Sequence, residues 1–160
     1  MSETICDVRW EGPVEWKERK KLSAPEHVIY ALYGAHHQYG NLVLLYIGKT
    51  EGDVGTRLAG HGGWINQEWE TNTMRVKAAS VGTFTSIEAW WNAYDPNARY
   101  KKAAAKLVGD VESLLIYAHQ PAYNTQGKGA LNSKCQQLRV FNTGQVGSLL
   151  PEVSYAYFCE

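Results

Sequence analysis

Two short runs rich in β-forming residues lie close together near the start of the chain, and they constrain the fold more than any other feature. They cover residues 27–33 (HVIYALY) and 41–47 (NLVLLYI). The segment between them begins at Gly34 and ends at Gly40. Runs of this composition joined by a short glycine-containing loop are typical of a β-hairpin. We therefore expect an antiparallel pair of strands early in the fold.

The longest helix is predicted from about residue 99 to residue 119. Its apolar residues recur at helical spacing and form one stripe, made of Leu107, Val108, Val111, Leu114, Leu115 and Ala118. At about 100° per residue, Glu112 lies at one edge of this stripe and Asp110 at the other. Pro121 ends the helix. Because an unpaired carboxylate beside an apolar stripe is costly, Glu112 is a candidate functional residue.

Weaker patterns predict the remaining elements. A short helix is expected over 54–61 and a third strand over 74–84. The spacing from Thr85 to Glu88 is that of a capping box, which predicts a helix through Trp91. A further strand is expected over 137–141 (QLRVF). Together these elements indicate an α+β fold, with a small, central, mostly antiparallel sheet flanked by helices.

The length of 160 residues, or 17.9 kDa, is that of a single compact domain. In residues 1–25, tryptophans alternate with charged residues, and we expect this segment to be an N-terminal arm. The core is expected over residues 26–126. Residues 127–160 are then a C-terminal extension packed on that core.

The cysteines and the apolar runs bear on where such a chain works. Three cysteines, Cys6, Cys135 and Cys159, are widely spaced and form no CxxC pair. This pattern argues against a disulfide framework or a structural zinc site and favours reduced thiols. The N-terminus is acidic and lacks the apolar segment of a signal peptide. The longest apolar run, 42–48, is far shorter than the roughly 20 residues that cross a bilayer, so we expect a cytoplasmic protein without membrane association.

The charges sum to zero, with 16 basic and 16 acidic residues, but they are segregated along the chain. Residues 99–151 hold seven basic and two acidic side chains, a net charge of +5, whereas residues 1–98 carry −3. The neutral total therefore does not argue against DNA. Such an uneven distribution predicts modest non-specific DNA binding that falls steeply with salt.

Several residues with chemical potential follow one another in a distinctive order. The two β-rich runs contain Val28-Ile29-Tyr30 and Tyr46-Ile47-Gly48. Arg57 and His61 are four positions apart, so both lie on one face of the short helix. Glu112 and Asn124 come later, twelve positions apart. Over roughly residues 26–126 this set resembles the GIY-YIG nuclease superfamily, which includes homing endonucleases, some restriction enzymes and a subunit of excision repair.

The resemblance implies a role for each matched residue. The tyrosines of the two family triplets correspond to Tyr30 and Tyr46, and the closing glycine corresponds to Gly48. The helical arginine, the residue one turn later, the metal-binding glutamate and the late asparagine correspond to Arg57, His61, Glu112 and Asn124. Two departures stand out: valine replaces the glycine of the first triplet, and the tyrosines are sixteen positions apart, more than is usual in the family.

These groups suit the hydrolysis of a phosphodiester bond. One carboxylate, completed by waters and phosphate oxygens, can hold Mg²⁺ or Mn²⁺, and Glu112 is the expected ligand. The guanidinium of Arg57 matches phosphate oxygens. Tyrosine, histidine or both could accept the proton of the attacking water, and the resemblance favours a tyrosine assisted by His61. A tyrosine has an ordinary pKa near about 10, so it needs nearby cations such as Arg57, Lys49 or the metal.

The resemblance therefore implies a metal-dependent endonuclease that hydrolyses DNA. Further contacts to the substrate are expected from Gly48, Lys49, Lys101, Lys102 and Lys128. The alternative function is a non-catalytic module of the same fold that binds nucleic acid or protein. No separate recognition domain is visible in the sequence, so a homodimer or a separate recognition partner could supply specificity.

Structural roles remain open for the same residue types. Strand tyrosines ordinarily serve packing, and Glu112 could form an ion pair with Lys101 or Lys106. The lysines near residue 101 could serve solubility or follow phosphates. We expect His36 and His37 in a solvated loop, His119 as a partner of its helix C-terminus, and Trp90 with Trp91 in the core.

Overall fold

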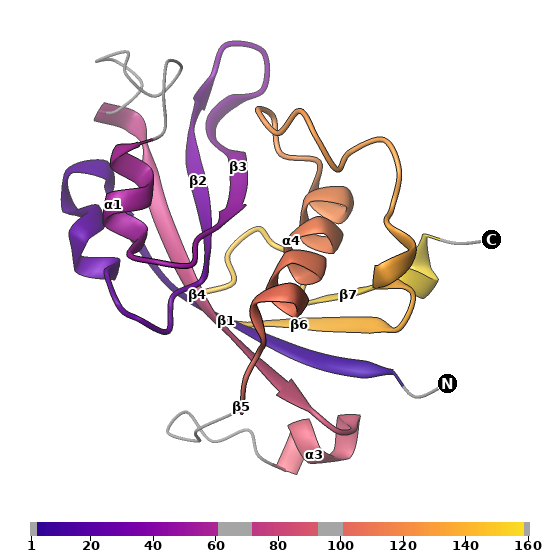
Figure 1. Cartoon of the computed structure of the whole chain (residues 1–160). Helices are drawn as coiled ribbons and strands as arrows, with labels where there is room; N and C mark the ends of the chain where they lie inside the picture. Colours follow the sequence, from indigo (N-terminus) through magenta and orange to yellow (C-terminus); the bar gives the residue numbers. More distant parts are fainter. Residues whose placement is uncertain (1–2, 61–71, 93–100, 159–160) are drawn as a thin grey trace.

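The structure, a computed structural model, describes residues 3–60, 72–92 and 101–158 (Figure 1). Seven strands form one sheet, with β3, β2, β4, β1, β6 and β7 side by side in that order and β5 paired with β4. Every pairing is antiparallel except that of β1 with β6. The strands are β1 (Thr4–Glu15), β2 (Ile29–His36), β3 (Gly40–Lys49), β4 (Arg75–Phe84), β5 (Lys101–Lys102), β6 (Leu138–Gly144) and β7 (Glu152–Ser154). The expected α+β class with a mostly antiparallel sheet is confirmed.

Helices cover both faces of this sheet, as Figure 1 shows. The α-helices are α1 (Val54–Ala59), α3 (Ile87–Asn92) and α4 (Ala105–His119), and the 3₁₀ turns are η1 (Trp16–Leu22), η2 (Ser133–Cys135) and η3 (Tyr155–Tyr157). Alternate residues of β2 belong to two different core clusters. Tyr30 and Leu32 pack with α1, whereas Ile29 and Ala31 pack in the cluster that includes α4. The hairpin therefore contributes side chains to both layers.

The expected N-terminal arm is wrong, because β1 lies in the interior of the sheet. It pairs with β4 on one side and with β6 on the other. Its residue Cys6 lies opposite Thr83 of β4 and Val140 of β6 and is completely buried. Residues after 127 also form part of the sheet, because β6 and β7 extend it beyond β1.

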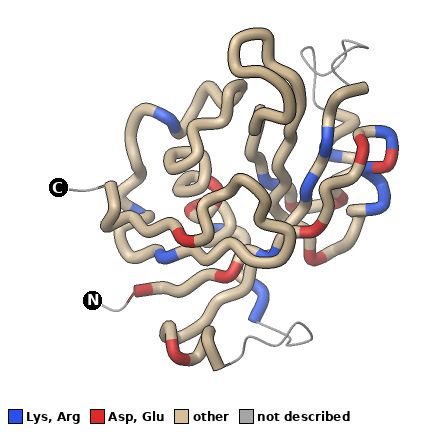
Figure 2. Tube along the Cα trace, turned by 180° about the vertical axis from the view of Figure 1, so that it is seen from behind, with Lys and Arg blue, Asp and Glu red and all other residues tan. Residues whose placement is uncertain are grey.

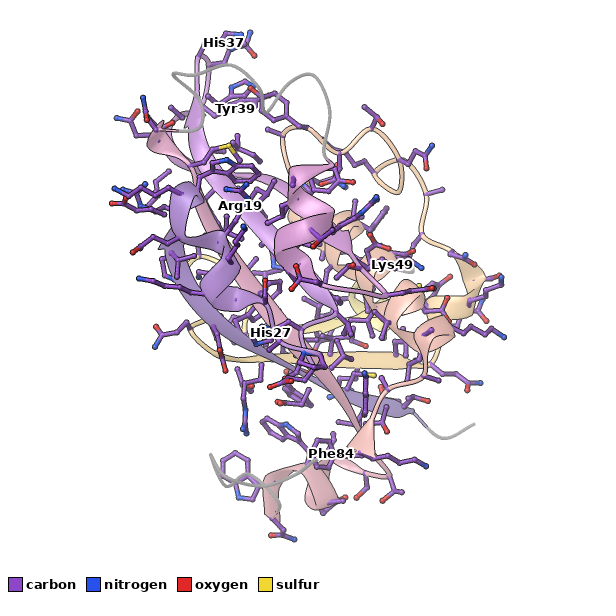
Figure 3. The ribbon with its side chains drawn as sticks, turned by 60° about the vertical axis from the view of Figure 1, so that its left-hand side comes forward. Arg19, His27, His37, Tyr39, Lys49 and Phe84 are labelled. Carbon is purple, nitrogen blue, oxygen red and sulfur yellow. The ribbon has the colours of Figure 1, made fainter. Side chains whose placement is uncertain are left out.

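Several element boundaries differ from the sequence prediction. Lys101 and Lys102 form β5 opposite β4, so α4 begins only at Ala105 and not near residue 99. The hairpin strands are longer than expected, which places His36 in β2 with only 9% of its surface exposed. The expectation of a solvated loop is therefore wrong for His36, although His37 is exposed at the tip beside Tyr39 (Figure 3).

Other local expectations have mixed outcomes. Trp90 stacks on Phe141, but Trp91 is 71% exposed and does not belong to the core. Ser86, rather than Thr85, accepts the capping hydrogen bond, from the backbone N–H of Ala89. The helix expected over 54–61 is present as α1, which ends at Ala59, and residue 61 lies outside the described residues.

The two described thiols and the histidine at the end of α4 agree with the sequence prediction. Cys6 and Cys135 are free and buried, and Cys159 lies outside the described residues. The His119 side chain lies 2.9 Å from the Leu115 carbonyl near the end of α4, as expected of a helix-terminal partner. Among the described helices, none has the length and apolar character needed to cross a membrane.

Candidate functional site

The two expected tyrosines meet on the α1 face of the hairpin. Tyr30 of β2 lies opposite Gly48 of β3, and Tyr46 lies opposite Leu32, so strand alternation turns both phenols to the same side. Their rings stack with centroids 6.1 Å apart and planes at 22°. Tyr30 is completely buried, whereas Tyr46 is partly exposed and lines a surface hollow.

Gly48 makes this stacking possible. A Cβ atom at this position would lie 2.5 Å from the Tyr30 hydroxyl oxygen and 2.7 Å from the Tyr46 ring. Both distances are well inside van der Waals contact, so any side chain here would displace the phenols. The glycine that closes the second triplet therefore has a clear steric function in this chain.

Arg57 approaches the tyrosines from α1. The helix begins directly after Asp53, whose side chain accepts a hydrogen bond of 2.7 Å from the Thr56 backbone. The Arg57 guanidinium donates a hydrogen bond to the Tyr30 hydroxyl and lowers the pKa of both tyrosines. Burial opposes this effect and dominates, so the pKa of each phenol lies above its ordinary value. His61, the expected partner one turn later, lies outside the described residues.

Glu112 reaches the same place from α4. It is half-buried, and burial raises the pKa of its carboxyl group. The Lys49 ammonium, a hydrogen bond from the Lys49 backbone and the charge of Arg57 oppose this rise. The carboxylate in turn raises the pKa of both tyrosines. The cations that lower the pKa of Glu112 are therefore Lys49 and Arg57. They are not Lys101 or Lys106, the two partners that the helix pattern left open.

Lys49 lies close to α4 because a glycine faces it there (Figure 3). Its Nζ atom is 3.1 Å from the position that a Cβ of Gly109 would occupy. Gly109 is three residues before Glu112, so it lies about one turn away on the same side of the helix. A larger residue at this position would push the ammonium away from the carboxylate.

Asn124 is fixed to β3 by both ends of its amide. Its Oδ1 accepts from the backbone N–H of Ile47, and its Nδ2 donates to the Ile47 carbonyl, each at 2.9 Å. The backbones of Ala122 and Tyr123 also donate to Leu44 and Leu45. The asparagine thus holds the strand segment on which Tyr46 and Gly48 are placed.

The expected lysines occupy three different surroundings. Lys49 and Lys102 line one hollow of about 230 Å³ beside the start of α4. Lys101 is exposed in β5, on the strand opposite Thr83. The ammonium of Lys128 instead donates to the Pro121 carbonyl at 2.7 Å, so it is engaged in holding the loop after α4.

A second hollow, of about 470 Å³, is lined by three of the side chains that the sequence pattern singled out. Tyr46, Glu112 and Asn124 line it, together with Ser113 and residues 125–127. The sequence pattern did not single out these additional residues. Their only signal is proximity: Ser113 follows Glu112, and the loop follows Asn124.

The donor set can be compared with the needs of a metal ion. Among the described residues, no group of three His, Cys, Asp or Glu side chains is placed to hold a metal. Glu112 is the one carboxylate among the residues that line the 470 Å³ hollow, which has room for water and phosphate oxygens. Mg²⁺ is commonly held by one or two carboxylates with waters and substrate phosphates, so the site fits this type of binding.

The arrangement brings together one carboxylate, one guanidinium, one ammonium and two phenols from β2, β3, α1 and α4. These groups can bind an anionic ester, hold a hard cation and exchange a proton. No family model, curated protein or solved structure matches this chain.

Proposed function

We propose that this protein is a metal-dependent endonuclease that hydrolyses DNA phosphodiester bonds. The observation that carries the proposal is the convergence of Tyr30, Tyr46, Arg57 and Glu112 at one edge of the sheet, each from a different element. A purely structural packing of strand tyrosines would not require a guanidinium and a half-buried carboxylate in the same place.

Arg57 and Lys49 would bind the phosphate. The guanidinium cannot lose its charge and presents a planar pair of N–H groups to two oxygens, whereas the ammonium acts as a point charge. Glu112 would hold Mg²⁺ or Mn²⁺ with waters and substrate oxygens. When bound, that ion would stabilise the charge that develops on the phosphate and the leaving oxygen.

Tyr46 is the better placed of the two tyrosines to exchange a proton with water. Tyr46 lines the hollow beside Glu112, whereas Tyr30 is completely buried. Burial raises the pKa of both phenols, so the ionised form that a base requires is disfavoured before substrate binds. Arg57 lowers the pKa of both and is the side chain that favours the ionised form. We assign Tyr46 as the proton acceptor, with His61 assisting it.

DNA is the substrate class that the charge distribution favours. Lys49 and Lys102 line the hollow beside the site, and residues 99–151 carry a net charge of +5. The 3₁₀ turn η1 holds a second group of basic side chains with acidic ones beside them (Figure 2), and two of its lysines, Lys17 and Lys21, form ion pairs with Glu15 and Glu18. We place the phosphate backbone on the α4 side of the site, along the hollow that Lys49 and Lys102 line. One site per chain implies that cleavage of both strands needs a homodimer, a partner chain or two successive nicks.

The test is the conversion of supercoiled plasmids and branched DNA duplexes by the purified protein with Mg²⁺, with Mn²⁺ and with a chelator. We expect nicking that the chelator stops and that Glu112→Gln abolishes. A panel of DNAs is needed because a sequence-specific enzyme would leave one plasmid intact. If the wild type leaves the whole panel intact but still retards DNA in a gel, the non-catalytic binding function replaces the enzyme.

A further inference from the structure

A second polar cluster lies on the opposite face of the sheet from the tyrosine pair. Lys77 of β4 points to the α4 side, and only 5% of its surface is exposed. Its ammonium donates to the carbonyls of Gln145 and Val146 at 2.8 and 3.2 Å and lies 5.2 Å from the centre of the Tyr33 ring. All three partners are neutral. Among the ion pairs of the described residues, none involves Lys77.

Burying the Lys77 ammonium costs free energy when no negative charge lies beside it. Two carbonyls and an aromatic face compensate only part of the lost hydration, and an apolar side chain of the same length would avoid the loss altogether. Burial accordingly lowers the pKa of Lys77. A bound anion would supply the missing charge.

A cavity of about 350 Å³ is open beside this ammonium. Tyr33, which is 5% exposed, lines it, and its buried hydroxyl has no hydrogen-bond partner of ordinary geometry among the described residues, although Ser148 lies beside it. Arg75 also lines the cavity, on the strand directly opposite Tyr33. Its guanidinium donates to the Met74 carbonyl and is only partly buried. The polar part of the cavity thus offers two cations and two hydroxyls.

The rest of the lining is apolar. Pro13 and Leu42 contribute to it, and Leu42 is 63% exposed at the rim. Gly147 lets the covering loop lie tightly over the lysine, because a Cβ at this position would be 2.5 Å from Nζ. The cavity therefore combines a fixed, buried positive end with an apolar wall.

We propose that this cavity binds a small carboxylate with an apolar body. The carboxylate would pair with the Lys77 ammonium and accept from the Tyr33 hydroxyl, while the apolar body would lie against Pro13 and Leu42. A carboxylate provides what each buried group lacks, a negative charge for the lysine and an acceptor for the phenol. The site lies on the other face of the sheet from Tyr46, so it does not depend on the proposed nuclease function.

The probe is benzoate, titrated calorimetrically into the wild-type protein with benzyl alcohol as the neutral control. We expect benzoate to bind with a dissociation constant at or below about 1 mM, and benzyl alcohol to bind at least about tenfold more weakly. Lys77→Met should weaken benzoate binding at least about tenfold, and Tyr33→Phe about threefold to tenfold. Lys128→Met is the matched control, because that ammonium also binds a carbonyl but lies outside the cavity.

Equal binding of benzoate by the wild type and Lys77→Met would overturn the proposal, as would no binding up to about 10 mM. If Lys77→Met does not fold, the decision rests on Tyr33→Phe and on the lysine side-chain NMR signals of the wild type. One buried lysine signal should then shift with benzoate and not with benzyl alcohol. Unchanged lysine signals, or undiminished binding by Tyr33→Phe, would contradict the site.

Discussion

The two polar clusters on opposite faces of the sheet differ in how their charges are balanced. At the β3 edge, the charges of Lys49 and Arg57 lower the pKa of Glu112, and the Glu112 carboxylate raises the pKa of both tyrosines. In the cavity on the other face, Lys77 has only carbonyls and an aromatic ring as partners. Burial disfavours the charged form in both places, but only the β3 edge supplies opposite charges that counteract it.

This difference indicates two kinds of site. A cluster that contains both signs of charge can position a substrate and stabilise changes of charge with its own side chains. A buried cation among neutral groups needs a ligand that brings the opposite charge. We therefore expect substitutions at the β3 edge to slow cleavage, and matched substitutions elsewhere to leave the cleavage rate unchanged.

Apart from substitution of the proposed metal ligand Glu112, the largest effect is expected for Tyr46→Phe. Removing the hydroxyl that we assign as the proton acceptor should reduce the rate of plasmid nicking by about 10²–10⁴-fold while the fold is kept. The measurement is the initial nicking rate at saturating Mg²⁺, with the circular dichroism spectrum as a check on folding. Tyr117→Phe, a change on the outer part of α4, should leave the rate unchanged. Wild-type rates for Tyr46→Phe would remove this tyrosine from the mechanism.

Gly48→Ala should disturb both activity and stability. The added methyl group would lie 2.5 Å from the Tyr30 hydroxyl oxygen, so the stacked phenols must move apart. We expect a loss of about 1–3 kcal/mol in the free energy of unfolding and at least about tenfold slower nicking. Urea denaturation measures the first effect. Gly129→Ala is the matched control, since its Cβ would meet no atom within 4 Å, and an equal loss in both variants would argue against the steric role of Gly48.

Asn124 and Asn142 allow a direct comparison of two buried amides. Asn124 bonds both polar groups of Ile47, whereas Asn142 accepts from the Trp10 indole at 2.9 Å and donates to the Leu150 carbonyl at 2.7 Å. Each substitution by alanine should cost about 2 kcal/mol of unfolding free energy, because it leaves buried partners unsatisfied. Only Asn124→Ala should also slow nicking. A similar loss of cleavage in both variants would show that the effect is one of stability alone.

The smallest effect concerns the stability of Glu112→Gln. Burial raises the pKa of this carboxyl in the folded protein, so its ionised form destabilises the fold. This cost is absent below the pKa of the unfolded chain, near about 4.3, and it appears as the pH rises through the higher folded pKa. Glu112→Gln should therefore melt at a higher temperature than the wild type at pH 7, with a difference that shrinks towards pH 4. A constant difference across this range would contradict the assigned burial of the charge.

Local periodicity was enough to predict the central part of this site. The hairpin, the strand over 74–84 and the apolar face of α4 all follow from alternation or helical spacing, and the structure contains each of them. Once β2 and β3 are paired, it follows that the side chains of Tyr30 and Tyr46 lie on the same face of the sheet. Gly48 could be identified by its place in the triplet, but its steric reason became visible only with the two rings above it.

Non-local pairing explains what the sequence did not reveal. The central place of β1 depends on partners such as Val140, more than a hundred residues away, and no local pattern encodes that choice. Lys77 likewise sits in an otherwise β-like run, where a single lysine is typical of a solvent-facing position. It is buried because the loop containing Gln145 folds over it, and that loop lies 68 residues further along the chain.

Glu112, the proposed ligand of the metal ion, can be compared with Asp110, the other acidic residue of α4. Asp110 lies at the opposite edge of the apolar stripe, where its backbone carbonyl accepts from the Cys135 thiol. Glu112→Gln and Asp110→Asn each remove one negative charge from α4. We predict no Mg²⁺-dependent nicking above background for Glu112→Gln and wild-type nicking for Asp110→Asn. Equal activity in the two variants would contradict the assignment of Glu112 as the metal ligand.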